Sequence, residues 1–151
     1  MQQADSIWVI TFVIIAGALQ AWGPPMNGAL NKALVNPWLA SLVSFLPIIC
    51  LLFCLFLCSP LPLPNLNDIK TMPWWAPLGG VAGAFAVIGG LLYVHKIGAG
   101  TFAGLTITAN IIMSLLIDKF GLFGMQPHEL NTGRVIGGFF MIVGITLISM
   151  Y

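Results

Sequence analysis

Three amide side chains recur along the first apolar stretch of the sequence: Gln20, Asn27 and Asn31. Their separations of seven and four residues place them on one face of a helix. Amides donate and accept hydrogen bonds without carrying charge, and polar side chains within a membrane usually face the interior of a helix bundle. We therefore expect this row to line a cavity that binds a small molecule.

A second polar row lies in the fourth apolar stretch, where Thr106, Asn110, Ser114 and Asp118 follow one another at intervals of four residues. Serine, threonine and asparagine can also join helices, through hydrogen bonds worth about 0.6 kcal/mol each. This structural role is favoured for the hydroxyl groups, whereas a cavity is favoured for the amides. Ser41 and Ser44 add a smaller polar patch in the second stretch.

If the chain is a membrane carrier, Asp118 is the candidate for coupling to an ion, since coupled carriers usually place a carboxylate near the midplane. If the fourth helix continued through residues 120–123, Asp118 would lie a turn or more inside it. Otherwise it is an interfacial residue paired with nothing special. No other acid is a candidate for a midplane position. A neutral, zwitterionic or lipophilic substrate therefore fits better than a bare cation, which needs a counter-charge in a low dielectric.

Gly23, Pro24 and Pro25 interrupt the first apolar stretch near its middle. Because proline has no N–H, the carbonyls of Gln20 and Ala21 lose their helical partners, which is tolerated at membrane depth only against protein or water. The three residues are candidates for a hinge or a binding backbone, as in transporters with broken helices, and a structural proline kink is the alternative. The candidate substrate-binding residues are Gln20, Trp22 as an aromatic wall, Asn27, Asn31, Tyr93, Thr106, Asn110 and Ser114.

The remaining reactive side chains form no catalytic pattern. His95 and His128 are isolated, and the sequence contains no Ser–His–acid set, zinc-protease motif or phosphate-binding loop. Cys50, Cys54 and Cys58 share a helix face; a soft-metal stripe is conceivable there, but cysteine more often packs as a small apolar residue. The net charge is +1, without a basic patch. We expect no enzymatic activity, cofactor, metal or nucleic-acid partner.

The elements that carry these residues are apolar stretches of membrane-spanning length. Charged residues make up 6% of the chain and apolar residues 59%, and the charges lie at the ends of the apolar stretches. About 18 or more uncharged apolar residues are typical of a transmembrane helix. The sequence predicts an all-α integral membrane protein with one transmembrane domain over residues 1–151. Its five helices are expected at about 6–31, 38–58, 74–94, 97–117 and 134–151.

The basic residues hardly favour either orientation in the lipid bilayer. A cytoplasmic N-terminus would put Lys70, Lys119 and Arg134 inside, and the opposite orientation would put Lys32 and Lys96 inside. If both orientations are made, two copies related by an in-plane two-fold axis would form a ten-helix assembly, as in inverted-repeat carriers. We expect a homodimer, with parallel and antiparallel arrangements both open at this point.

Several short motifs occur in an order that resembles one family. They are Asn27-x-x-Leu30; Pro37-x-x-Ala40-Ser41-x-x-Ser44-Phe45; Trp74-Trp75 with Gly79-Gly80-x-x-Gly83; Gly98-Ala99; Ile117-Asp118-x-Phe120-Gly121; and Arg134-x-x-Gly137 with Gly144. Over nearly its whole length the chain resembles the YdcZ-type, five-helix branch of the drug/metabolite transporter superfamily. The resemblance implies one half of a ten-helix bundle and a role in the export of small organic compounds.

Two departures from the family concern the expected site. Relatives often carry Gly-Gln where this chain has Ala109-Asn110, and a glutamine where it has Gly23, so that the nearest glutamine is Gln20. The first hypothesis is a multi-pass secondary transporter of the cell inner membrane that exports small metabolites or drug-like compounds by alternating access. The alternative is a non-transport assembly or regulatory subunit that pairs with another five-helix chain.

Overall fold

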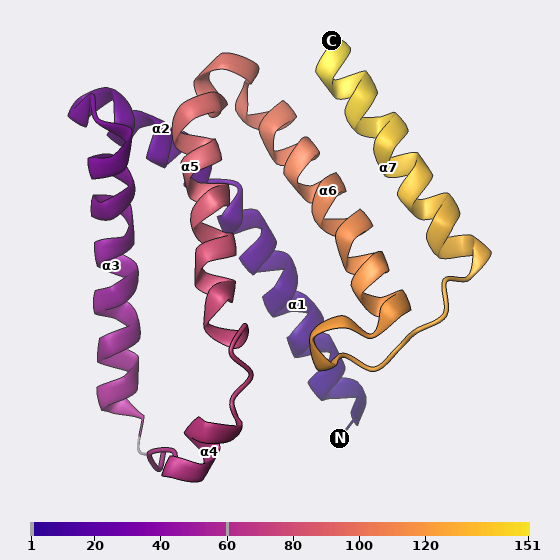
Figure 1. Ribbon diagram of the computed structural model, residues 1–151. Helices are drawn as coiled ribbons and strands as arrows, with labels where there is room; N and C mark the ends of the chain where they lie inside the picture. Colours follow the sequence, from indigo (N-terminus) through magenta and orange to yellow (C-terminus); the bar gives the residue numbers. More distant parts are fainter. Residues whose placement is uncertain (1, 60) are drawn as a thin grey trace. The chain divides into compact units, whose positions relative to one another are not determined.

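The computed structural model describes residues 2–59 and 61–151, with side chains from residue 7 onward. Within these ranges every regular element is a helix (Figure 1), which confirms the predicted all-α fold. The elements are α1 (Gln2–Gln20), α2 (Gly23–Leu34), α3 (Pro37–Cys58), α4 (Leu66–Thr71), α5 (Gly79–Ile97), α6 (Ala99–Phe120) and α7 (Thr132–Met150), with 3-10 turns η1 (Ala76–Leu78) and η2 (Leu122–Gly124).

Five segments of the described chain are long and apolar enough to cross a membrane, as predicted. They are Ile7–Leu34, Pro37–Cys58, Ala76–Ile97, Ala99–Phe120 and Thr132–Met150. Helix α5 begins at Gly79 instead of near Trp74, because two prolines hold the preceding residues in turns. Helix α6 ends at Phe120, where Gly121 adopts a φ of 59°, so Asp118 lies in its last turn.

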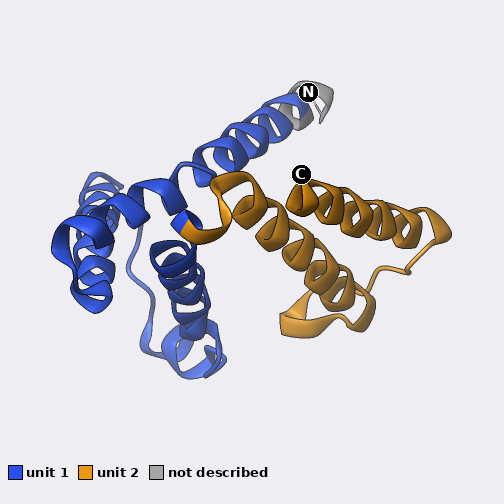
Figure 2. Cartoon of the chain, turned by 90° about the horizontal axis from the view of Figure 1, so that it is seen from above, with its two compact units in different colours: residues 1–95 blue, residues 96–151 orange. Residues whose placement is uncertain are grey.

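The contacts within the chain divide it into two compact units, residues 1–95 and residues 96–151 (Figure 2). The first unit contains helices α1 to α4 and nearly all of α5. The second contains α6, α7 and the loop between them. The packing that positions the candidate side chains is found within each unit.

The first span is interrupted between α1 and α2, as the sequence predicts. Helix α1 ends at Gln20, and the next two residues form a turn. The backbone N–H of each donates to the carbonyl three residues earlier, over 3.2 and 3.1 Å. Helix α2 begins at Gly23, with Pro24 and Pro25 in its first turn, where the missing N–H groups remove no helical bond within α2. The two prolines therefore mark the start of a separate helix.

Helix α2 packs closely against α5 at positions where one partner is glycine. A methyl group added at Gly28 would lie 2.7 Å from side-chain atoms of both Val94 and His95. A methyl group added at Gly90 would lie 3.1 Å from Cα of Pro24. Because both distances are shorter than an ordinary van der Waals contact, the two helices approach as closely as they do only in the absence of side chains here.

Two side-chain hydrogen bonds connect α2 to both of its neighbours. The hydroxyl of Ser44 in α3 donates to Oδ1 of Asn27 over 2.7 Å, and Nδ2 of Asn31 donates to the carbonyl of Leu91 in α5 over 3.1 Å. By contrast, every side chain described in α1, from Ile7 to Gln20, is exposed. Helix α2 is therefore bonded to two other helices, whereas the described side chains of α1 make no such bond.

In the second unit, α6 packs on α7 along a face that contains Gly104, Thr108 and Leu115. The side chain of Ile145 fills the space beside Gly104, and a methyl group at Gly138 would lie 3.7 Å from Leu115. Thr108 lies between these contacts on the same helical face. It is 6% exposed, and its hydroxyl has no hydrogen-bond partner among the described residues. The contact along this face is therefore close, and Thr108 supplies the polar group among the residues named here.

A double-mutant cycle will measure how strongly the Asn27–Ser44 bond joins α2 to α3. We expect a coupling energy of about 0.6 kcal/mol between Asn27→Ala and Ser44→Ala, the typical value for hydrogen bonds between membrane helices. Unfolding of the purified protein by sodium dodecyl sulfate in mixed micelles measures it. Asn27→Ala with Ser149→Ala is the matched control pair, because the Ser149 hydroxyl bonds its own helix in the other unit. Additive effects in both pairs would contradict a stabilising bond.

Candidate functional site

The residues expected in the binding site divide between the two units. Gln20, Trp22, Gly23, Pro24, Pro25, Asn27, Asn31 and Tyr93 lie in residues 1–95, and Thr106, Asn110, Ser114 and Asp118 lie in residues 96–151. In the first unit, the half-buried amides of Asn27 and Asn31 bond other helices, as described above. The bond from Ser44 uses only the oxygen of the Asn27 amide, whose nitrogen carries two further donors.

Gln20 and Trp22 lie at the break in the first span, and both are exposed. Gln20 is the last residue of α1 and lies near the middle of the span Ile7–Leu34. Trp22 is 65% exposed and Tyr93, on α5, is 51% exposed. Because hydrocarbon offers no hydrogen-bond partner, an exposed amide at this depth is unstable against lipid. The side chain of Gln20 therefore requires water, a ligand or another protein surface.

The polar row of α6 divides into residues with different surroundings. The Thr106 hydroxyl donates to two carbonyls of its own helix, over 2.8 and 3.0 Å. Asn110 and Ser114 are exposed. Asn110 follows Thr108 by two residues, which is about 200° around the helix, so it lies on the side away from α7. It also lies near the middle of the span Ala99–Phe120, and its amide has the same need for a polar partner.

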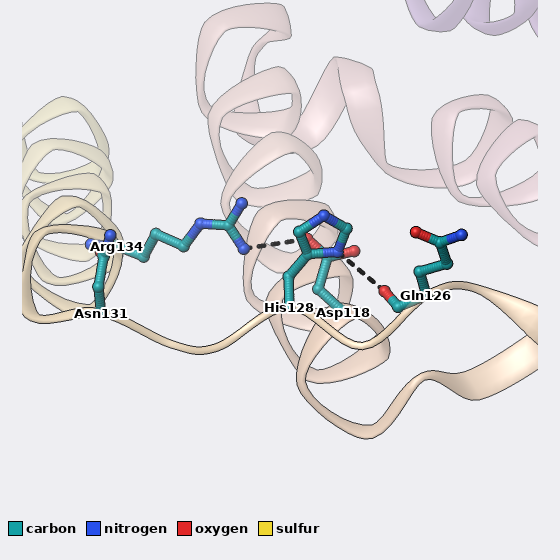
Figure 3. A network of polar contacts seen from close by, with 5 residues as sticks. All are labelled: Asp118, Gln126, His128, Asn131 and Arg134. Atoms are coloured by element: carbon teal, nitrogen blue, oxygen red, sulfur yellow. Dashed lines mark hydrogen bonds and ion pairs between the residues drawn. The ribbon is translucent and has the colours of Figure 1, made fainter.

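Asp118 lies at the end of its span. Of the two positions considered from the sequence, it therefore takes the interfacial one and not the one inside the helix. Its carboxylate accepts a hydrogen bond from the guanidinium of Arg134 over 3.3 Å, which joins the end of α6 to the start of α7 (Figure 3). The sequence analysis did not identify this partner. The signal was available, because a short loop between two consecutive spans brings their charged ends to the same membrane face.

The histidine and cysteine side chains of the described residues form no metal site. Within the described residues, no group of three or more His, Cys, Asp or Glu could hold a metal ion. The three cysteines are exposed along α3, and His95 packs on the α2 backbone at Gly28. Near the middle of the spans the described chain offers amides and hydroxyls, which can bind a ligand by hydrogen bonds.

A comparison with protein families finds a match to the family described as "Putative inner membrane exporter, YdcZ" over residues 8–147. No curated protein and no solved structure matches the chain. The matched residues cover nearly all of the five spans, and a family of membrane exporters is not a class of enzymes. The chain therefore belongs to the YdcZ family, described as putative inner membrane exporters, and is a multi-pass protein of the inner membrane.

Proposed function

We propose that the chain exports small organic molecules by alternating access, and that Gln20 in the first unit and Asn110 in the second each contact the substrate along its path across the membrane. The observation that carries this proposal is the exposure of two amides, each near the middle of a span. Because lipid cannot satisfy an amide, such side chains are stable only against water, a polar ligand or protein. A polar site near the midplane is the usual place for substrate binding in secondary carriers.

The distribution of charge favours a substrate without net positive charge. The acidic residues are Asp5, Asp68, Asp118 and Glu129, and none of them lies near the middle of a described span. The carboxylate of Asp118 is paired with Arg134 at a span end. A bare cation at mid-depth would lack a counter-charge in a low dielectric. Neutral or zwitterionic compounds, held by amides and by the aromatic face of Trp22, fit this environment.

The break in the first span supplies the moving part in this proposal. Helix α2 is tied to α3 and α5 by the bonds of Asn27 and Asn31, and it packs closely on α5 at Gly28. Helix α1 is joined to α2 by a two-residue turn, and its described side chains are exposed. A swing of α1 about this turn, immediately before Gly23–Pro25, therefore disturbs few contacts, and it moves Gln20 directly.

The transporting unit in this proposal is a homodimer with ten helices. A methyl group added at Gly79, Gly80 or Gly83 of α5 would meet no atom within 4 Å, so this glycine-rich face is open. Glycine faces allow close helix approach in lipid, where packing drives association. The nearly equal distribution of basic residues between the two membrane faces supports an antiparallel pair.

Substitution of Asn110 tests the proposed site. A thermal-shift screen first supplies an uncharged or zwitterionic compound that stabilises the wild-type protein, and its flux is measured in proteoliposomes. We expect Asn110→Ala to lower kcat/KM about fivefold, as for the loss of one hydrogen bond of about 1 kcal/mol. Thr146→Ala is the control, because the exposed Thr146 hydroxyl bonds its own helix. Unchanged flux in Asn110→Ala would remove this residue from the site.

Reporter fusions at Tyr151 test the antiparallel dimer. A fluorescent protein that matures only in the cytoplasm and an alkaline phosphatase that is active only in the periplasm should both give signal, because both orientations are made. An added basic residue, Asn67→Lys, should increase the fraction with a cytoplasmic N-terminus. Signal from only one of the two reporters in the wild-type chain is the result that excludes an antiparallel homodimer.

A further inference from the structure

An open depression of about 540 Å³ lies beside the loop between α6 and α7, within the second unit. It is lined by Lys119, Pro127, His128, Glu129 and Leu130. Lys119 lies in the last turn of α6, and the loop joins two membrane-spanning helices. The depression therefore lies where a span leaves the hydrocarbon, at the level of the lipid headgroups.

Several contacts hold this loop in a defined shape. The backbone amide of His128 donates to the carbonyl of Asp118 over 2.8 Å, which brings the loop back to the end of α6. A methyl group at Gly121 would lie 2.8 Å from Pro127, and the φ of 59° at Gly121 also suits glycine. Asn131 accepts a hydrogen bond from the amide of Arg134 and caps α7. The backbone of the loop beside the depression is therefore held in place before any ligand binds.

The charges around the depression are left available for a ligand. Asp118 and Arg134 pair with each other (Figure 3), whereas Lys119 and Glu129 make no ion pair within the described part of the chain. The ammonium group of Lys119 lies 5.4 Å from the centroid of the Phe120 ring, which keeps it near the membrane surface. The depression thus presents one cation and one anion.

His128 adds a hydrogen-bond acceptor beside this pair of charges. Its Nδ1 lies 2.8 Å from the carbonyl oxygen of Gln126 (Figure 3). Because a carbonyl only accepts, Nδ1 carries the hydrogen, and in the neutral ring Nε2 is then an acceptor. The carboxylate of Glu129 also accepts. Together they suit a ligand ammonium group that bears N–H bonds.

We infer that this depression binds the headgroup of a zwitterionic phospholipid that carries a primary ammonium group, which is the phosphoethanolamine headgroup. Lys119 binds the phosphate, and Glu129 with Nε2 of His128 accepts hydrogen bonds from the ammonium group. A choline headgroup has no N–H to donate, and a glycerol headgroup has no cation. The apolar side chains of Pro127 and Leu130, at the level where the span ends, favour a membrane lipid over a soluble phosphoamine.

Native mass spectrometry of the full chain in detergent tests this inference, with dioleoyl phosphatidylethanolamine, phosphatidylcholine and phosphatidylglycerol as probes. We expect phosphatidylethanolamine to bind about tenfold more tightly than the other two lipids, as hydrogen bonds to charged groups would give. Lys119→Gln should weaken its binding about tenfold, and Glu129→Gln should remove the preference over phosphatidylcholine. Melting temperatures of the lipid-free variants verify that each is folded.

Lys70→Gln is the matched control, because Lys70 lies on α4, outside the depression. Equal binding of the three lipids, unchanged affinity in Lys119→Gln, or an unchanged preference over phosphatidylcholine in Glu129→Gln would each overturn the inference. An equal loss in Lys70→Gln would show a general effect of charge and would overturn it as well. The binding of free O-phosphoethanolamine is measured as the final comparison. If it bound as tightly as the lipid, the ligand would be a soluble phosphoamine and the lipid site would be wrong.

Discussion

A polar group in the middle of a bilayer has no water to bond with, and it must find a partner in protein or in a ligand. Several polar groups in the described spans have a protein partner. Ser44 bonds Asn27, Asn31 bonds the backbone of α5, and Thr106 bonds its own helix. Gln20 and Asn110 lie near the middle of their spans and are exposed. These two amides are therefore where the chain needs something outside the contacts of its own units.

The same constraint bears on the hinge proposed in the first span. A helix break exposes carbonyls, and Pro24 and Pro25 cannot supply the missing donors. The chain compensates by starting a new helix at Gly23 and by fixing that helix between two neighbours. The contacts of α2 hold it against α3 and α5, whereas α1 makes few contacts beyond the turn. Such a division fits a carrier in which one element moves against a fixed scaffold.

Much of this architecture follows from the sequence, because length and hydropathy alone determine which segments can span a membrane. The five spans were predicted in this way, and the break at Gly23 was predicted from the two prolines that follow it. The start of α5 was placed too early near Trp74, because hydropathy does not register that two prolines hold a segment in turns. The Ser44–Asn27 bond was not predicted either, because helical spacing identifies a polar face but not the helix that covers it. Whether Gln20 and Asn110 bind a substrate remains a proposal.

The central claim is that Gln20 faces a polar path and not lipid. Labelling of Gln20→Cys in the membrane, with Cys50, Cys54 and Cys58 replaced by alanine, tests it most directly. The reagent is a membrane-impermeant maleimide, applied to intact cells and to inverted vesicles. The account predicts labelling of Gln20→Cys and no labelling of Ile14→Cys, which lies on another face of the same helix. If Gln20→Cys were as unreactive as Ile14→Cys from both sides, Gln20 would face lipid or dry protein, and the account would be contradicted.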